Sequence, residues 1–361
     1  MLHSPALTRI SLATLAIFAF RLCKPQISAY MTDMIDGHGR HIDYLRISVT
    51  DRCNFRCHYC MPEKQKFLPH ADVLDYSEIA LLANRFIAHG IRKIRLTGGE
   101  PLVRRDIDIL INELGTHVQA GRLDELTLTT NGSRLRQFAP ILARSSFSRV
   151  NISLDSLNPD MFRTITRGGD LAQVLDGISA AAEHGLRVKI NMVALKDENQ
   201  SEIIAMAEFC AANRYDLSLI ETMPLGEGVA DRQDRYIPME DFIAPLRDCF
   251  ELEPLAHRSS GPARYWNVAP LGLRLGLITP MTHNFCDDCN RLRLTTDGKI
   301  YMCLGSSMNV DFRKAMRENG MEAVDKLLQQ ALRLKPARHD FERQLAEPAQ
   351  RLSRHMNATG G

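Results

Sequence analysis

Six runs rich in β-branched residues alternate with helix-like segments, and this alternation is the strongest constraint on the fold. The runs cover residues 44–50, 91–97, 125–131, 149–155, 187–193 and 217–223. Between them, residues 77–90, 105–118, 170–185 and 201–214 place apolar side chains at helical spacing. Strands that alternate with helices pair in parallel through right-handed crossovers, so we expect the helices to cover the sheet.

The number of strand–helix units predicts an α/β fold with an open barrel. A closed barrel of this kind needs eight units, whereas this chain shows six. We therefore expect an incomplete (β/α)6 TIM-like barrel, with a doubly wound sheet as the alternative. In both folds the functional side chains gather beyond the carboxyl ends of the strands. Motifs at those strand ends are the candidates for a functional site.

The pattern changes after the sixth run, which indicates a second domain. Residues 224–238 contain several Gly and Pro residues, and a helix-like stretch and a second group of cysteines follow. A chain of 361 residues exceeds what one small core usually holds. We predict a first domain over residues 31–240 and a smaller C-terminal domain over residues 241–361.

Residues 1–30 differ from the rest of the chain. They contain three basic residues, no acidic residue and an apolar stretch from Leu12 to Phe20. That stretch is shorter than the roughly 20 residues of a membrane-spanning helix. We interpret the extension as a start site assigned too far upstream, an organelle presequence or a secretion signal. We expect a cytoplasmic protein, located in an organelle matrix if the extension is a transit peptide, with no membrane partner.

The charge balance limits the partners. The chain has 45 basic and 43 acidic residues and a net charge of +2, which argues against a general nucleic-acid surface. Any site for an anion must therefore be local. The chain has no G-x4-G-K-[ST] loop of the kind that cradles a nucleotide for ordinary hydrolysis.

Six of the nine cysteines fall into two groups of three. They are Cys53, Cys57 and Cys60, and Cys286, Cys289 and Cys303. In a long chain of cytosolic character, such clusters bind metal more often than they form disulfides. A structural zinc site takes four protein ligands, and a cubane cluster takes one thiolate for each iron, so three thiols leave one metal position open. For the second group, zinc with His283 as fourth ligand is the alternative.

The first group resembles the radical S-adenosylmethionine (SAM) superfamily. It reads C-x3-C-x2-C directly after the first strand, with an aromatic residue before the last cysteine. The resemblance implies a 4Fe–4S cluster whose open iron binds SAM and whose electron converts SAM to methionine and a 5′-deoxyadenosyl radical. In the order of the superfamily, strand ends carry "LTGGEPL", "NISLDS" and "IETM". The residues implied to contact SAM are Tyr59, Gly99, Ser153 and Met223.

The second group resembles the GTP 3′,8-cyclase family of molybdenum cofactor biosynthesis, and this likeness extends from about Arg46 to the end of the chain. Its pattern is C-x2-C-x13-C, followed after the second cysteine by "NRLRL". The resemblance implies a lyase with a second 4Fe–4S cluster that binds GTP, a homodimer, and a downstream cyclic pyranopterin monophosphate synthase. The residues implied to contact GTP are Arg46, Arg95, Thr129, Lys189, Arg291, Leu292 and Arg293. The alternatives are another radical SAM enzyme, such as a peptide-modifying one, and a zinc-dependent binding module.

Two further patterns bear on substrate binding. Residues two apart on a strand face the same side, so Arg291 and Arg293 should act together on an anionic substrate. The chain ends in Gly360 and Gly361, and such ends are usually frayed. The resemblance instead implies that this pair forms a catalytic tail that reaches into the active site.

Overall fold

The computed structural model describes residues 34–226, 234–259, 261–347 and 352–360. These residues belong to one compact unit. The predictions for residues 1–30 and for Gly361 lie outside the described residues. None of the helices in the described part of the chain is long and apolar enough to cross a membrane.

All six predicted strands are present and pair in parallel in sequence order. They are β1 (Tyr44–Ser48), β2 (Lys93–Thr97), β3 (Glu125–Thr130), β4 (Arg149–Ser153), β5 (Arg187–Val193) and β6 (Asp216–Ile220). The sheet has twelve strands in the order β12-β11-β10-β1-β2-β3-β4-β5-β6-β9-β8-β7. Its two ends do not pair with each other among the described residues, so the sheet is not closed.

The C-terminal third of the chain extends both ends of the six-stranded core. Next to β1 lie β10 (Arg291–Leu294), β11 (Lys299–Tyr301) and β12 (Asn309–Asp311), and next to β6 lie β9 (Leu273–Ile278), β8 (Arg264–Ala269) and β7 (Glu251–Leu255). β10 and β9 are parallel to their core neighbours, and the outer strands are antiparallel. Of these six strands, the sequence analysis anticipated only β10, through the same-face spacing of Arg291 and Arg293.

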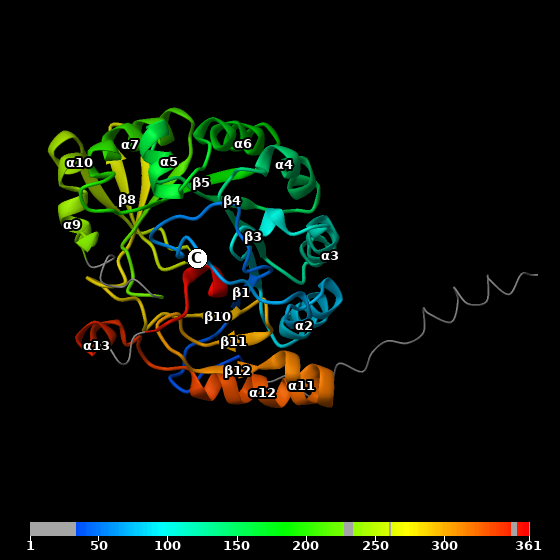
Figure 1. The fold of residues 1–361 in the computed structure, drawn as a ribbon. Coiled ribbons are helices and arrows are strands. Elements are labelled where there is room, and N and C mark those ends of the chain that lie inside the picture. Colours follow the sequence, from blue (N-terminus) through cyan, green and yellow to red (C-terminus); the bar gives the residue numbers. More distant parts are fainter. Residues whose placement is uncertain (1–33, 227–233, 260, 348–351, 361) are drawn as a thin grey trace, which may run out of the picture. The chain divides into compact units, whose positions relative to one another are not determined.

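Helices follow the core strands and cover one side of the sheet. They are α2 (Tyr76–Ala88), α3 (Ile107–Gln119), α4 (Leu135–Arg144), α5 (Pro159–Thr166), α6 (Leu171–Glu183) and α7 (Ile203–Ala212). Figure 1 shows them in an arc around the strands, with the C-terminal helix α14 (Met356–Thr359) on the inner side. The other helices of the described residues are α9 (Met239–Phe242), α10 (Ala244–Cys249), α11 (Phe312–Asn319), α12 (Met321–Leu334) and α13 (Phe341–Ala346), with 3-10 turns at His70–Asp72, Pro101–Val103 and Gln200–Glu202.

Side-chain hydrogen bonds define where several helices begin. At α2, Asp75 Oδ1 accepts from the Glu78 backbone N–H at 2.8 Å, and Glu78 Oε2 accepts from the Asp75 backbone N–H at 2.9 Å. This reciprocal capping box satisfies two N–H groups that have no partner within the helix. At α5 and α6, the side chains of Asn158 and Asp170 accept from backbone N–H groups of the first turn, without a reciprocal bond.

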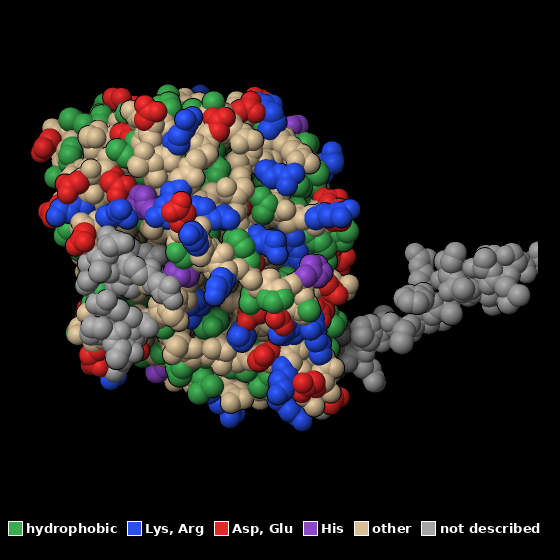
Figure 2. All heavy atoms as spheres, in the orientation of Figure 1, with side chains coloured by type: hydrophobic (Ala, Val, Ile, Leu, Met, Phe, Trp, Pro, Cys, Tyr) green, Lys and Arg blue, Asp and Glu red, His purple; other side chains and the backbone are tan. Residues whose placement is uncertain are grey.

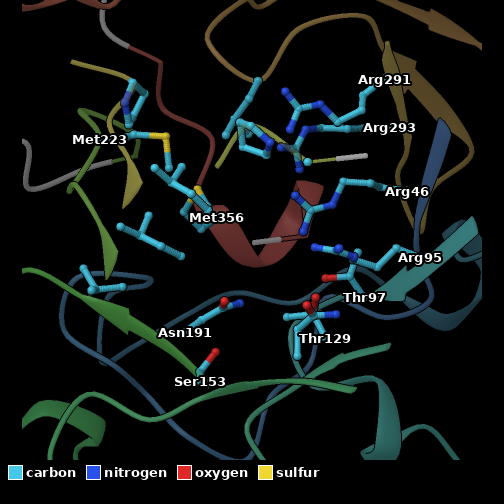
Figure 3. Close-up of a pocket in the computed structure, with 18 of the residues that line it drawn as sticks. Arg46, Arg95, Thr97, Thr129, Ser153, Asn191, Met223, Arg291, Arg293 and Met356 are labelled. Atoms are coloured by element: carbon cyan, nitrogen blue, oxygen red, sulfur yellow. The ribbon is translucent and has the colours of Figure 1, made fainter. Parts of the chain in front are cut away.

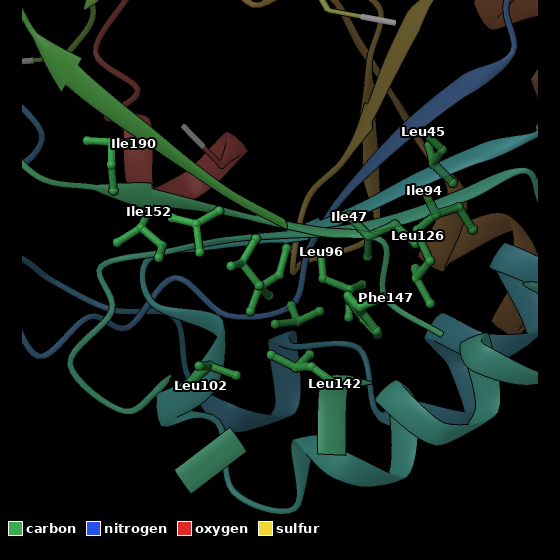
Figure 4. Packing of buried hydrophobic residues seen from close by; sticks show 14 of the residues in the cluster. Leu45, Ile47, Ile94, Leu96, Leu102, Leu126, Leu142, Phe147, Ile152 and Ile190 are labelled. Carbon is green, nitrogen blue, oxygen red and sulfur yellow. The ribbon is translucent and has the colours of Figure 1, made fainter. Parts of the chain in front are cut away.

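Alternation along the strands separates the core from the inner side of the sheet. Leu45, Ile47, Ile94 and Leu96 are fully buried and pack toward the helices (Figure 4). Residues between them, such as Arg46, point to the opposite face, as expected for a period of two. The apolar face therefore stabilises the fold, and the polar face is left to build a site.

Candidate functional site

A cavity of about 290 Å³ lies on the inner side of the sheet. Residues from both cysteine groups line it, although these groups are more than two hundred positions apart in the chain. The predicted residues that line it are Arg46, Cys53, Cys57, Tyr59, Cys60, Arg95, Gly99, Thr129, Ser153, Lys189, Met223, Cys286, Cys289, Arg291, Arg293 and Cys303. Leu292 does not line the cavity, because its side chain is fully buried on the opposite face of β10.

The loop that carries the first cysteine group is held by the end of α5. The backbone N–H of Arg56 donates to the Thr166 carbonyl at 3.0 Å, and that of His58 donates to the Ile165 carbonyl at 3.1 Å. Phe55 also packs edge-on against Phe162, with ring centroids 6.0 Å apart. These contacts fix the loop between the three thiols to the core.

Gly99 lets the loop after β2 approach the cysteine loop closely. Its N–H donates to the Thr50 carbonyl at 2.7 Å. A Cβ at this position would lie 2.3 Å from the Arg52 carbonyl oxygen, which is far inside van der Waals contact. Close packing against Arg52 therefore explains why this position is a glycine. Its predicted contact with SAM stays a prediction.

Tyr59 is oriented by a buried carboxyl group that the sequence analysis missed. The Tyr59 hydroxyl donates to Asp155 Oδ2 at 2.7 Å, and the other oxygen of Asp155 accepts from the Val193 backbone N–H at 2.8 Å. Burial raises the pKa of Asp155 to about 6, although both hydrogen bonds oppose that shift. Asp155 comes two residues after Ser153, beyond the end of β4, where a carboxylate is a recognisable signal.

The two thiol groups lie in different electrostatic environments. Burial, and then the nearby Glu100 carboxyl, raise the pKa of Cys53 to about 12. Burial also raises the pKa of Cys289, but the Arg291 and Lys335 cations outweigh it and lower that pKa to about 6. Acidic neighbours thus accompany the first group, and cations accompany the second.

The thiol arrangement fits clusters better than single ions. Among the described residues, no three His, Cys, Asp or Glu side chains converge closely enough to hold one metal ion. A cubane cluster binds each thiolate through a different iron atom, so its ligands need not converge on one point. Each group presents three thiols to a shared cavity, as such a cluster with one open iron requires.

Three neighbouring strands place four arginines together. In the strand register, Arg46 on β1 lies opposite Arg293 on β10 and opposite Arg95 on β2, and Arg291 lies opposite Tyr44. Figure 3 shows the four guanidinium groups directed into the same space. Burial, and then the charges of Arg293 and Arg95, lower the pKa of Arg46, and burial followed by the charge of Arg291 lowers that of Arg293 to about 10.

This grouping is costly unless an anion is bound, because buried like charges repel each other in a poorly solvated site. On the outer face that Figure 2 displays, basic and acidic side chains are interspersed. Arg149 and Lys189 add to the basic lining, and the Lys189 ammonium donates to the Tyr265 hydroxyl at 3.0 Å. Basic side chains thus gather inside the cavity, and the local anion site stays a prediction for this place.

The C-terminal tail reaches this cavity. Met356 lines it, and Asn357 Nδ2 donates to the Asp51 carbonyl at 2.8 Å, next to the first cysteine group. The Gly360 carbonyl accepts from Arg293 Nη1 at 2.7 Å. Gly360 has φ of 72°, and a Cβ there would lie 2.2 Å from Thr97 Cγ2. The tail is therefore packed up to Gly360 rather than frayed.

Two family models match consecutive parts of the chain. The model described as the radical SAM superfamily matches residues 47–210, and the model described as Molybdenum Cofactor Synthesis C matches residues 215–341. The first covers the end of β1, β2 to β5 and the first cysteine group. The second covers all three cysteines of the second group.

Relatives match nearly the whole chain. A protein of Rhizobium meliloti (strain 1021) named GTP 3′,8-cyclase is 53% identical over 331 residues, which cover 91% of this chain and 94% of the relative. A Brucella ovis protein of the same name is 52% identical over 331 residues, covering 91% and 96%. The chain belongs to the GTP 3′,8-cyclase family.

A solved structure supports the fold. The crystal structure of Streptococcus suis SuiB bound to S-adenosylmethionine superposes with a TM-score of 0.54 at 17% identity, over 82% of this chain and 69% of that one. At this identity the likeness concerns the fold alone. It agrees with a mixed α/β chain built on an open sheet.

Membership of the GTP 3′,8-cyclase family argues against the zinc-dependent binding module. The structure agrees, because His283 is exposed and is not among the residues that line the cavity. The thiols of the second group face the cavity without it.

Tyr44 is a lining residue that the sequence analysis missed. Its side chain is 3% exposed, its hydroxyl has no hydrogen-bond partner, and its ring lies 5.6 Å from the Arg95 guanidinium carbon. Tyr44 precedes Arg46 by two residues on β1, so alternation along that strand was the available signal. A buried hydroxyl without a partner costs about 1–3 kcal/mol, which a bound polar ligand can offset.

Proposed function

We propose that this chain is a radical SAM lyase that converts GTP to (8S)-3′,8-cyclo-7,8-dihydroguanosine 5′-triphosphate, the first step of molybdenum cofactor biosynthesis. The observation that carries the proposal is one cavity that is lined by both thiol triplets and by four arginines, of which Arg46, Arg291 and Arg293 are buried and Arg95 is half-buried. One triplet suits the chemistry of SAM, and the arginines suit a triphosphate. The names of the relatives supply the same substrate and reaction.

On one side of the cavity, Cys53, Cys57 and Cys60 would hold the first 4Fe–4S cluster. When bound, this cluster and SAM supply the 5′-deoxyadenosyl radical that removes the 3′ hydrogen of GTP. The residues proposed to position SAM are Tyr59, Gly99, Ser153 and Met223. The hydrogen bond from Tyr59 to Asp155 holds the ring of Tyr59 in place, and the packed tail helps to exclude water.

On the other side, Cys286, Cys289 and Cys303 would hold a second 4Fe–4S cluster with an open iron for GTP. The residues proposed to bind GTP are Arg46, Arg95, Thr129, Lys189, Arg291 and Arg293, with Leu292 taking part only through its backbone. We add Tyr44, whose hydroxyl lies among these cations. Charge-assisted hydrogen bonds contribute roughly 1.5–3 kcal/mol each, so several of them can hold a triphosphate after the ordering costs are met.

The tail is proposed to be catalytic in the sense of touching the substrate. Gly360 and Gly361 would position the ribose for hydrogen removal, because residues without side chains fit between two ligands in a narrow cavity. Support comes from the contact between Gly360 and Arg293. Gly361 lies outside the described residues.

The finer architecture is part of the proposal. We propose that β1 to β6 with their helices form an incomplete (β/α)6 barrel over residues 31–240, and that residues 241–361 form the domain of the second cluster. We also propose a homodimer in the cytoplasm that passes its product to a cyclic pyranopterin monophosphate synthase. For residues 1–30 we keep the interpretation of a presequence-like or wrongly started extension.

Anaerobic incubation with GTP, SAM and a strong reductant tests the proposed function. We expect 5′-deoxyadenosine and a new nucleotide that has the mass of GTP but separates from it by chromatography, because cyclisation rearranges GTP without a net change in atoms. Iron and sulfide should each reach about eight per chain for two cubane clusters. Cleavage of SAM without any change in GTP would instead favour another radical SAM enzyme, such as a peptide-modifying one.

A further inference from the structure

Lys335 is a buried cation, and its ammonium group donates hydrogen bonds to the chain segments that carry the second cysteine group. It follows α12, and the residue is 2% exposed. Its ammonium donates to the Met302 carbonyl at 2.7 Å, to the Arg291 carbonyl at 3.0 Å and to Cys289 Sγ at 3.3 Å. Met302 directly precedes Cys303, and Arg291 follows Cys289 by two positions. One ammonium group therefore joins both segments that carry these thiols.

The charge of Lys335 needs an anionic partner. Its three hydrogen bonds go to a sulfur and two carbonyl oxygens, and none goes to a carboxylate. A buried ammonium without a counter-charge costs several kcal/mol, and Arg291 and Arg293 add positive charge nearby. The partner that can carry negative charge is the sulfur of Cys289, as a thiolate bound to iron.

The first cysteine group has a different set of partners. Cys53 Sγ accepts from two neutral donors, the Phe55 backbone N–H at 3.4 Å and Asn131 Nδ2 at 3.8 Å. The buried carboxyl groups of Glu100 and Asp155 interact electrostatically with Cys53 and Cys57. Carboxyl groups thus lie near the thiols of the first triplet, where the cation of Arg56 donates to the carbonyls of Cys53 and Phe55. In the second triplet a buried ammonium contacts a thiol sulfur itself.

We propose that Lys335 is a positioning residue that holds Cys289 for the second cluster and raises the redox potential of that cluster above that of the first. This inference rests on the proposed function, because it requires both clusters. Hydrogen bonds and positive charge at a ligand sulfur stabilise the more negative, reduced state of an iron–sulfur cluster. The same electron is therefore held more readily on the GTP side of the cavity than on the SAM side.

Redox titration of the anaerobically purified holoenzyme, followed by electron paramagnetic resonance, tests this role. Lys335→Met removes the charge and the donors at similar length, and Lys335→Gln keeps a donor without the charge. Lys326→Met is the matched control, because Lys326 lies on α12 but is exposed. Addition of SAM identifies the signal of the first cluster, so the two potentials can be followed separately.

We expect Lys335→Met to lower the potential of the second cluster alone, Lys335→Gln to give an intermediate value, and Lys326→Met to change neither cluster. Loss of about half of the iron in a Lys335→Met protein that keeps the first cluster's signal and its circular dichroism also supports the holding role. If Lys335→Met does not fold, Lys335→Gln carries the same comparison.

An unchanged potential of a fully loaded second cluster in the Lys335 variants would overturn the inference, and so would an equal shift of both clusters. Failure of the proposed function looks different. In that case the wild-type protein itself would lack the second cluster or would leave GTP unchanged.

Discussion

Arg293 Nη1 lies 2.7 Å from the carbonyl oxygen of Gly360, so an arginine beside the second cysteine group holds the end of the chain. The same guanidinium nitrogen lies 3.5 Å from the Thr359 carbonyl. Because Arg293 also lines the cavity with four other arginines, one side chain links the proposed GTP site to the tail. Arg293 is therefore the side chain that we expect to place the tail beside bound GTP.

Gly360→Ala should disrupt the tail without removing either cluster. The added methyl group would lie 2.2 Å from Thr97 Cγ2, and φ of 72° disfavours any residue with a Cβ. We expect product formation to fall by at least about tenfold, which corresponds to about 1.4 kcal/mol. Anaerobic turnover, together with iron content and calorimetric GTP binding, measures this.

Thr97→Ser provides a compensating partner for that experiment, because it removes the clashing Cγ2 atom. The double variant should recover only part of the lost rate, since the backbone strain at position 360 and a close contact with the hydroxyl oxygen of residue 97, 2.8 Å from the added Cβ, remain. Deletion of Gly360 and Gly361 should abolish the cyclised nucleotide and leave both clusters, melting and GTP binding near wild type. Normal product formation by the truncated protein would show that the tail has no catalytic role.

Cys57→Ser should separate the two halves of the cavity. Cys57 is a proposed ligand of the first cluster, so its loss should end 5′-deoxyadenosine formation. The second cluster depends on other cysteines and should stay measurable by iron analysis and spectroscopy. Cleavage of SAM at the wild-type rate in this variant would refute the assignment of the first cysteine group.

Tyr44→Phe should weaken GTP binding specifically. The variant keeps the ring beside Arg95 and removes the buried hydroxyl that has no partner in the protein. Loss of one hydrogen bond of about 1–1.5 kcal/mol corresponds to a roughly 5- to 12-fold weaker affinity. Calorimetric titration with GTP measures the change, and the affinity for SAM should stay the same.

Tyr76→Phe is the matched control for that experiment. Tyr76 also packs against an arginine, Arg104, but its hydroxyl donates to the Arg105 carbonyl at 2.6 Å and it does not line the cavity. The Tyr76→Phe protein should therefore bind GTP with the wild-type affinity. Equal GTP affinity in the Tyr44→Phe and Tyr76→Phe proteins would show that the Tyr44 hydroxyl does not contact GTP.

Glu100 should make stability depend on pH. Burial raises its pKa from 4.5 to about 7, although it accepts hydrogen bonds from Leu102, Thr130 and Asn131. Because the folded-state pKa is raised, its contribution to stability is complete below about pH 4.5 and is lost as the pH rises through about 7. Relative to Glu100→Gln, the wild type should lose about 3 kcal/mol over that interval.

Urea unfolding of the anaerobically purified wild type and Glu100→Gln proteins, from about pH 4.5 to about pH 8, measures that difference. Glu100→Gln adds no pH dependence at this position, because its amide does not titrate. Any change in the difference between the two unfolding free energies therefore comes from Glu100. A difference in unfolding free energy that stays the same across the whole interval would mean that Glu100 is not buried as a titrating group.

Local patterns predicted the framework, and the family resemblance implied most of the site residues that line the cavity. The β-branched runs located β1 to β6 within a few residues, because each strand has one face fully buried in the core. Alternation along a strand also placed Arg291 and Arg293 on one face, and Figure 3 shows both directed into the cavity. Such features depend on residues that are close together in the sequence.

Features that depend on distant pairing were not predicted. The sequence did not indicate that β10 lies beside β1, although this register brings Arg293 opposite Arg46. Lys335 was missed for the same reason, since it comes 46 positions after Cys289 and belongs to no motif. Gly99 was read through its resemblance to a SAM loop, whereas the structure also gives it a packing role beside Arg52.

The most direct test of the central claim follows the hydrogen that the radical removes. GTP that carries deuterium at the ribose 3′ carbon is incubated anaerobically with the protein, SAM and a reductant, and the nucleosides are analysed by mass spectrometry. We predict that 5′-deoxyadenosine gains one deuterium and that a cyclised isomer of GTP loses it. Formation of 5′-deoxyadenosine without deuterium, together with recovery of unchanged GTP, would contradict the account.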